Sequence, residues 1–370
     1  YTVIDIGYLE ILMNINEICE QFNLSGTLFE YELLPSGNIN TTYRVVCKDG
    51  DETYEYLLQK INENVFKSPE KIMDNIIRVT KYISEHNTSG KLCVLKFNTV
   101  GGVPYLIDEV GDFWRCRQFL DCVVFDETDD LFVIEEAGAA FGEFQYLLNG
   151  FDAASLYVSI KDFHNTPVRL KNCESAIKYA VGERKQAAKA EIEYILENKA
   201  RACVLADMLK KGELPLRVTH NDTKCNNVVF NKDTLKSLAV IDLDTIMPGL
   251  TAYDFGDGAR SICASVKEDE ADISKVNFDL KKFDSFAKGY LRHLGKVLTE
   301  NELKTLGISV FVLTFELASR FVEDYLNGDT YFKVRYAEHN LVRAKNQIAL
   351  AKDILNKLGE INAVIEKYSK

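Results

Sequence analysis

The pattern of apolar and polar positions changes about a third of the way along the chain. Residues 9–22 have the apolar spacing of a helix. From Glu30 the pattern becomes short and strand-like, and the Asp-Gly pair at residues 49–50 predicts a hairpin turn. Ser68 followed by Pro69 is typical of a helix start and predicts a helix that runs to about Ser84. Further strands are predicted at residues 92–97, 103–108 and 113–120.

Helical patterns dominate from about residue 130 to the end, around one β-rich island at residues 216–245. The predicted helices include Glu135–Leu148, Glu183–Lys211, Phe278–Leu294, Glu300–Asn327 and His339–Lys370. We therefore predict an α+β protein with two lobes. A β-rich N-lobe with a leading helix and an antiparallel sheet covers residues 1–118. A hinge at residues 119–122 leads to a mainly helical C-lobe at residues 123–370.

Composition narrows the class of protein. A net charge of -12 and a pI near 5.1 argue against a nucleic-acid-binding protein, because that affinity depends on clustered Lys and Arg. Nine single cysteines without a CxxC pair favour reduced thiols and a cytoplasmic location. The sequence contains no run of about 18 apolar residues, which is the length that predicts a membrane span. The sequence leaves the oligomeric state open.

The β-rich island contains a set of residues suited to phosphoryl transfer. It reads H-x-D-x-x-x-x-N from His220 to Asn227, and a strand ending in Asp242 follows. Phosphoryl transfer needs one carboxylate that accepts the proton of the attacking hydroxyl, together with oxygen ligands for magnesium ions on the ATP phosphates. Asp222 is the predicted catalytic base, and Asn227 with Asp242 is the predicted metal pair. A hairpin between them would bring residue 242 back beside residues 222–227.

The alternative is that Asp222 and Asn227 only shape a loop, which Asp and Asn often do. The hairpin and the terminal IDLD sequence favour phosphoryl transfer over that alternative. His220 could serve only to brace the loop backbone.

This segment resembles the aminoglycoside phosphotransferase/choline kinase superfamily, and within it most closely the N-acetylhexosamine 1-kinases. Similar stretches occur in the same order along nearly the whole chain. They are SGNINTTYRV (36–45), LLQKINENVFKSPEKIMDNI (57–76), EAGAAFGEFQYLL (136–148), THNDTKCNNVVF (219–230), AVIDLDTIMPGLTAYDFGDGAR (239–260) and DYLNGDTYFKVRYAEHNLVRAKNQ (324–347). The resemblance implies a protein-kinase-like fold with ATP between the lobes, magnesium ions, and transfer of the γ-phosphoryl group to the anomeric hydroxyl of N-acetylglucosamine or N-acetylgalactosamine.

The resemblance also implies roles for residues of the N-lobe. Lys60 falls where the family places a cation against the ATP phosphates, and Glu70 or Asp74 would be its acidic partner. Gly37, Asn38 and Asn40 fall on a turn that approaches phosphate and sugar. This chain has Asn38 where the family commonly has His in G-H-I-N, which weakens the expectation of a sugar contact there. Lys60 could instead be a solvated strand end, and Gly37 a simple turn glycine.

Two residues of the predicted C-lobe complete the set that the resemblance implies. Arg320 and Tyr331 match positions that touch the sugar. The alternatives are a surface cation for Arg320 and a packed aromatic for Tyr331.

One motif is misleading. Asp254-Phe255-Gly256 spells the protein-kinase DFG, but it lies 32 residues after Asp222 (254 − 222), beyond the hairpin. We expect Asp254 to cap or brace the helix that follows it. The chain has no G-x-x-x-x-G-K-[ST] sequence and no GxGxxG near residue 37, so it is neither a P-loop enzyme nor a typical protein kinase.

Three other functions stay open at this point. The acceptor could be another small alcohol, such as an aminoglycoside, choline or a different sugar. The chain could be a nucleotide-binding regulator without catalysis, which an intact Asp222, Asn227 and Asp242 disfavour. Metal-dependent hydrolysis without a nucleotide is the third.

Overall fold

The computed structural model describes residues 15–35, 39–87 and 92–370. The predicted residues Gly37 and Asn38 lie outside these ranges. The chain divides into two compact units, one formed by residues 1–85 and 93–122 and the other by residues 86–92 and 123–370. Each unit is described by itself below.

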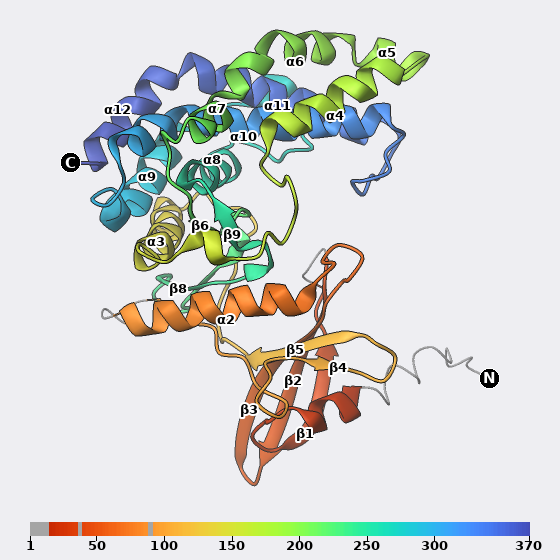
Figure 1. Cartoon of the computed structure of the whole chain (residues 1–370), viewed down its shortest axis with the longest axis vertical. Coiled ribbons are helices and arrows are strands. Elements are labelled where there is room, and N and C mark those ends of the chain that lie inside the picture. The colour runs from red at the N-terminus through yellow and green to blue at the C-terminus, as the bar shows by residue number, and fades with distance from the viewer. Residues whose placement is uncertain (1–14, 36–38, 88–91) are drawn as a thin grey trace. The chain divides into compact units, whose positions relative to one another are not determined.

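The first unit is built on one antiparallel sheet with the strand order β1-β2-β3-β5-β4 (Figure 1). Its elements are β1 (Thr27–Leu33), β2 (Thr41–Asp49), β3 (Glu52–Lys60), α2 (Pro69–His86), β4 (Leu106–Ile107) and β5 (Phe113–Gln118). The predicted Asp-Gly turn joins β2 to β3, with Asp49 paired to Glu52 and Gly50 at a φ of 58°. Glycine adopts that conformation without the steric cost of a side chain.

The two faces of this sheet carry different side chains because successive residues of a strand point to opposite faces. On one face, Leu58 and Trp114 pack with Ile15 and Ile18, which belong to a helix at residues 15–21. On the other face, the guanidinium of Arg115 lies 3.8 Å from the sulfur of Met73 in α2. The leading helix and α2 therefore pack against opposite faces of the sheet.

The predicted strand at residues 92–97 is wrong. Phe97 makes an isolated bridge to Arg117, and residues 92–96 have no strand conformation. Leu95 is nevertheless buried, so the apolar run of this segment reflects packing without a hydrogen-bonded ladder.

The second unit is mainly helical, with two small sheets that pair β6 with β9 and β7 with β8. Its strands are β6 (Arg217–Thr219), β7 (Val228–Phe230), β8 (Ser237–Val240) and β9 (Met247–Gly249). Its α-helices are α3 (Leu131–Leu147), α4 (Thr166–Tyr179), α5 (Glu183–Ala187), α6 (Lys189–Ala202), α7 (Val204–Lys210), α8 (Thr251–Ile262), α9 (Leu280–Leu294), α10 (Glu300–Leu326), α11 (His339–Asn356) and α12 (Leu358–Tyr368).

The single helix predicted over Glu183–Lys211 is wrong, because that segment forms α5, α6 and α7. The breaks fall at Ala188 and Cys203, whose backbone angles are close to helical. Neither glycine nor proline marks these breaks, so the sequence pattern alone does not reveal them.

Helix α10 is the core helix of the second unit and packs against α4, α8 and α11. A capping box between Thr299 and Glu302 fixes its start. Among the described residues it is the one helix long and apolar enough to cross a membrane, but 83% of that apolar stretch is buried inside the protein. Its apolar composition therefore reflects a core position.

Helices α3 and α9 approach each other closely through glycines. A Cβ atom on Gly142 would lie 2.1 Å from the backbone oxygen of Tyr290, and one on Gly289 would lie 2.0 Å from that of Glu135. The glycines of the EAGAAFGEF stretch therefore serve the packing of this helix pair.

Candidate active site

The loop that follows β6 holds Asp222, and its shape depends on an unusual backbone conformation at Asn221. Asn221 has a φ of 66°, which Asn tolerates better than most residues. Its side-chain amide nitrogen donates to the backbone oxygens of Thr219 (3.1 Å) and Thr245 (2.9 Å). We call residues 220–224 the Asp222 loop. The loop is buried at Asn221 and opens toward solvent at Asp222.

Two aspartates of α8 anchor the backbone of the Asp222 loop. The carboxylate of Asp254 accepts the N–H groups of His220 (2.8 Å) and Asn221 (2.7 Å), and that of Asp257 accepts the N–H of Thr223 (3.0 Å). Because buried N–H groups need acceptors, these bonds fix the path of the loop. The expectation that Asp254 caps or braces the following helix is wrong, since it lies inside α8 and binds the loop instead.

The pKa values of the two carboxylates shift in opposite directions. Burial raises the pKa of Asp254, although the hydrogen bonds that its carboxylate accepts from His220, Asn221 and Gln145 favour its ionised form. Burial would also raise the pKa of Asp257, but the charges of Arg260 and Lys224 outweigh it and the pKa of Asp257 is lowered. Arg260 lies 2.5 Å from the Asp257 carboxylate. Sequence reasoning missed Asp257, although two Asp residues three apart in an apolar helix are a visible signal.

Asp222 and Asn227 are brought into direct contact, as the motif predicted. The side-chain amide of Asn227 donates to the backbone oxygen (2.8 Å) and to the carboxylate (3.0 Å) of Asp222. Lys224, which sequence reasoning did not single out, lies 2.7 Å from the other carboxylate oxygen of Asp222. Burial would lower the pKa of Lys224, but the carboxylates of Asp222 and Asp257 raise it, so the ammonium stays charged.

The hairpin β7–β8 brings Asp242 back beside Asn227. Val228 pairs with Val240, and the N–H of Ile241 donates to the oxygen of Asn227 (2.9 Å). Asp242 itself has a φ of 58°, which turns the chain sharply after the strand. The spatial relation that the spacing predicted is thus present in the fold.

His220 links the loop before this hairpin to the residue that follows β8. Its Nδ1 accepts the N–H of Asp222 (3.3 Å), so its Nε2 carries the proton that bonds to the oxygen of Ile241 (2.8 Å). The ring is buried edge-on against Phe141 and Phe144. His220 therefore has the structural role that the sequence analysis considered for it.

The donor chemistry at the hairpin fits magnesium. The Asn227 amide nitrogen donates to Asp222, which leaves Oδ1 as the atom that would bind a metal ion, and Asp242 would supply a carboxylate. Magnesium commonly uses one or two such oxygens and completes its shell with phosphates and water. Over the described part of the chain no group of three or more His, Cys, Asp or Glu could hold a metal, so a site made wholly of such side chains is not present there.

The two residues expected at the sugar also meet. The guanidinium of Arg320 lies 5.5 Å from the ring centre of Tyr331 and 5.3 Å from that of Phe332, and it donates to the Tyr331 hydroxyl (3.4 Å). Tyr331 is 69% exposed. An aromatic face and a cation are thus open to solvent at one place.

Asp324 holds the loop that carries Tyr331. Its carboxylate accepts the successive N–H groups of Thr330 (2.9 Å), Tyr331 (2.8 Å) and Phe332 (2.9 Å). It also accepts the side-chain amide of Asn340 (2.9 Å). We call residues 328–333 the Tyr331 loop. Asp324 is buried, and sequence reasoning did not identify its role.

In the first unit, the predicted phosphate residues lie at one end of the β2–β3 ladder. Lys60 is paired across the ladder with Thr41 and forms an ion pair with Asp112. Asp74, one of the two expected partners of Lys60, is paired with Arg78 instead. The side-chain oxygen of Asn40 accepts the N–H of Asn62 (3.0 Å), which ties the start of β2 to the segment after β3.

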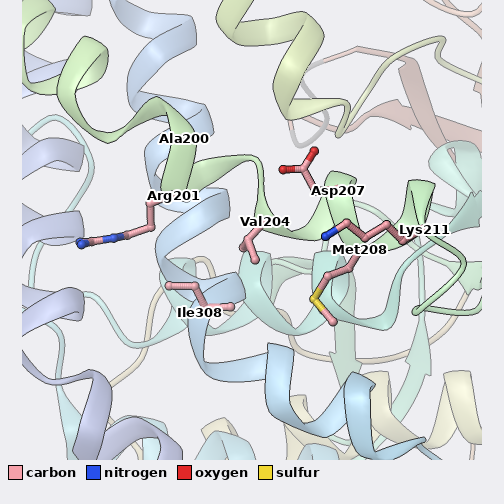
Figure 2. A pocket seen from close by; sticks show the side chains of 7 residues that line it. All are labelled: Ala200, Arg201, Val204, Asp207, Met208, Lys211 and Ile308. Carbon is pink, nitrogen blue, oxygen red and sulfur yellow. The ribbon is translucent and has the colours of Figure 1, made fainter.

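A groove of about 310 Å³ lies elsewhere in the second unit, against α6, α7 and α10 (Figure 2). It is lined by Ala200, Arg201, Val204, Asp207, Met208, Lys211 and Ile308. None of the predicted site residues lines it, so it has no part in the candidate site.

The sequence pattern of a phosphotransferase enzyme family matches residues 30–292, which is more than half of the chain. The chain belongs to this phosphotransferase enzyme family. The predicted superfamily is thereby confirmed, and the closer likeness to N-acetylhexosamine 1-kinases stays a prediction.

One curated protein resembles part of the chain in sequence. A protein from Nematostella vectensis, described as a probable ethanolamine kinase, is 30% identical over 132 residues, which cover 35% of this chain and 36% of that protein. The chain thus matches about a third of the length of this curated relative.

Two solved structures show the same fold. An aminoglycoside phosphotransferase from Alicyclobacillus acidocaldarius has a TM-score of 0.60 at 10% identity and covers 95% of this chain and 96% of its own. A spectinomycin phosphotransferase, solved with ADP and spectinomycin, has a TM-score of 0.52 at 12% identity, covering 96% and 98%. They confirm the predicted α+β, protein-kinase-like fold.

Proposed function

We propose that the protein is an ATP-dependent small-molecule kinase with Asp222 as its catalytic base. The main observation behind this proposal is the contact between Asp222 and Asn227. The hairpin β7–β8 also brings Asp242 next to Asn227. A base and two oxygen ligands at one hairpin are what phosphoryl transfer requires. The family and the ADP bound to the spectinomycin phosphotransferase support ATP as the phosphate donor.

The proposed reaction is a single displacement at phosphorus. The acceptor oxygen forms a bond to the γ-phosphorus, and the bond from that phosphorus to the β–γ bridging oxygen breaks to release ADP. The carboxylate of Asp222 orients the acceptor hydroxyl and takes its proton. The Lys224 ammonium, 2.7 Å from Asp222, supplies positive charge beside the transferred group. Magnesium, held by Asn227 and Asp242, would neutralise charge on the phosphates.

We further propose that the acceptor is N-acetylglucosamine or N-acetylgalactosamine and that phosphate is added to the anomeric hydroxyl. The exposed ring of Tyr331 beside the Arg320 guanidinium supports this, because an aromatic face with nearby donors suits a ring with apolar and hydroxyl surfaces. The same guanidinium disfavours a cationic acceptor by repulsion between like charges. We also propose a cytoplasmic location, which the nine free cysteines of the described chain support.

An acceptor screen tests this proposal. The protein would be incubated with ATP and magnesium together with N-acetylhexosamines, other sugars, aminoglycosides, choline or ethanolamine, and products would be analysed by NMR. We expect ADP formation with N-acetylhexosamines and phosphate on C1. Phosphate on another carbon or another acceptor would overturn the sugar assignment and leave the kinase assignment standing. ATP binding without turnover of any acceptor would favour a regulator that has lost catalysis.

The second candidate is an ethanolamine kinase. It is favoured by the 30% identity over 132 residues to the Nematostella vectensis protein. Phosphoethanolamine as the main product of the same screen would establish it.

A further inference from the structure

The peptide bond between Asn221 and Asp222 lies between two histidines. Its N–H donates to Nδ1 of His220 (3.3 Å), and its oxygen is 3.1 Å from Nε2 of His164. A carbonyl oxygen can only accept, so Nε2 of His164 carries a proton. This peptide leads directly into the catalytic base, and its orientation sets the starting direction of the Asp222 side chain.

A carboxylate of α10 contacts the ring nitrogen of His164 that does not face Asn221. Its Nδ1 lies 3.0 Å from Oε1 of Glu316, and Oε2 of Glu316 accepts the Thr166 hydroxyl (2.6 Å). Both side chains are buried, with exposures of 8% for His164 and 2% for Glu316. A buried carboxylate is costly unless it is paired, so this arrangement favours a His164 that donates at both nitrogens.

The other groups around the pair come from several elements. From α8, Tyr253 stacks obliquely at 5.3 Å from the His164 ring, and Asp257 adds negative charge. From α10, the charge of Arg320 favours the ionised form of Glu316. From α4, Arg169 lies close enough for its charge to interact with Glu316 and Arg320.

We propose that His164 and Glu316 are positioning residues for the catalytic base, acting through the Asn221 oxygen. The inference rests on the proposed function and deepens it, because it adds a reason for the orientation of Asp222. Displacing a reacting group by about 1 Å can cost about 10²-fold in rate. The pair would therefore affect the rate of the chemical step more than the binding of either substrate.

The test separates this role from a contribution to stability. His164→Ala leaves the Glu316 carboxylate buried without its partner, whereas the double variant His164→Ala/Glu316→Gln removes that uncompensated charge. We expect the single variant to lower both the melting temperature and kcat, the latter by about 10-fold to 10²-fold. The double variant should recover most of the melting temperature while kcat stays low. The KM values for ATP and acceptor should stay within about twofold.

Two comparisons sharpen the test. His164→Gln can still donate to the Asn221 oxygen and should recover part of the lost kcat. Lys357→Met removes a partly buried ion pair with Asp353, in α11, and should lower stability without changing kcat. Recovery of kcat together with melting temperature in the double variant would overturn the proposal.

Hydrogen exchange gives a readout that needs no acceptor. The amides of residues 220–223 should exchange faster in the double variant than in the wild type, while other segments stay unchanged. Unchanged exchange at these residues would overturn the positioning role. A wild-type protein that phosphorylates no acceptor would instead overturn the proposed function, and the exchange experiment would still decide the positioning role.

Discussion

The side-chain amide of Asn227 donates to both the backbone oxygen and the carboxylate of Asp222, at 2.8 and 3.0 Å. This contact joins the predicted metal ligand to the predicted base. It also directs the amide of Asn227 so that its oxygen is the atom left for the proposed magnesium ion. The predictions below follow from this arrangement and from the loops around it.

Asp242 can be tested without disturbing the backbone. Its φ of 58° disfavours most residues but is tolerated by Asn, so Asp242→Asn removes the charge and keeps the local conformation. We expect the magnesium concentration for half-maximal activity to rise at least about tenfold and kcat to fall. Magnesium titrations of both proteins at fixed ATP measure this. An unchanged titration would place the metal elsewhere.

Asp324 should control the affinity for the acceptor through the Tyr331 loop. Asp324→Asn removes the charge that gathers three successive backbone N–H groups, so we expect the acceptor KM to rise about tenfold with the ATP KM unchanged. Steady-state kinetics with each substrate varied in turn measure this. Asp279→Ala is the control, because Asp279 caps α9 and its loss should cost about 0.5–2 kcal/mol of stability without affecting KM. Equal KM values in wild type and Asp324→Asn would contradict the assignment.

Lys60 has two possible roles that a pair of variants distinguishes. If it binds ATP phosphates, Lys60→Met should raise the KM for ATP about tenfold through loss of a charge-assisted contact. Asp112→Asn removes its ion-pair partner and keeps its charge, so it should have a smaller effect. Equal effects of the two variants on the KM for ATP would indicate that the ion pair serves the fold alone.

The His164–Glu316 pair should make stability depend on pH. Burial alone would lower the pKa of His164, but Glu316 raises it above its ordinary 6.5. Burial alone would raise the pKa of Glu316, but His164 and Thr166 lower it below its ordinary 4.5. The contribution of His164 to the free energy of unfolding is therefore complete below pH 6.5 and is lost as the pH rises through the pKa of His164 in the folded protein. The contribution of Glu316 is complete above pH 4.5 and is lost as the pH falls through the pKa of Glu316 in the folded protein.

Urea unfolding at several pH values measures this effect. The free energy of unfolding of the wild type minus that of His164→Gln/Glu316→Gln should be largest between about pH 4.5 and 6.5. A difference that does not change with pH would show that the two residues are not a charged pair.

The sequence was most informative where partners lie close along the chain. Asp222 and Asn227 are five residues apart, and the Asp-Gly turn joins strands that are neighbours in sequence, so local spacing predicted both. His164 contacts Asn221 across 57 residues and Glu316 across 152. Such contacts depend on how helices pack, which local patterns do not encode.

Asp254 is another residue whose contacts the sequence did not predict. Its position just before a predicted helix suggested a cap, but it lies inside α8 and binds the Asp222 loop 33 and 34 residues away. Likewise, the role of Asp324 depends on a loop that folds back onto the helix end. The sequence shows where these aspartates lie along the chain. That their carboxylates accept backbone N–H groups is seen only in the three-dimensional structure.

The turnover number of Asp222→Asn, compared with that of Asp233→Asn, tests the central claim most directly. Asp233 lies exposed in the turn of the hairpin β7–β8 that follows Asp222, so its substitution is a matched control. With saturating ATP, magnesium and the best acceptor, we expect Asp222→Asn to lower kcat by about 10²–10⁴-fold and Asp233→Asn to leave it unchanged. A correctly folded Asp222→Asn protein with near-normal kcat would contradict the assignment of the catalytic base.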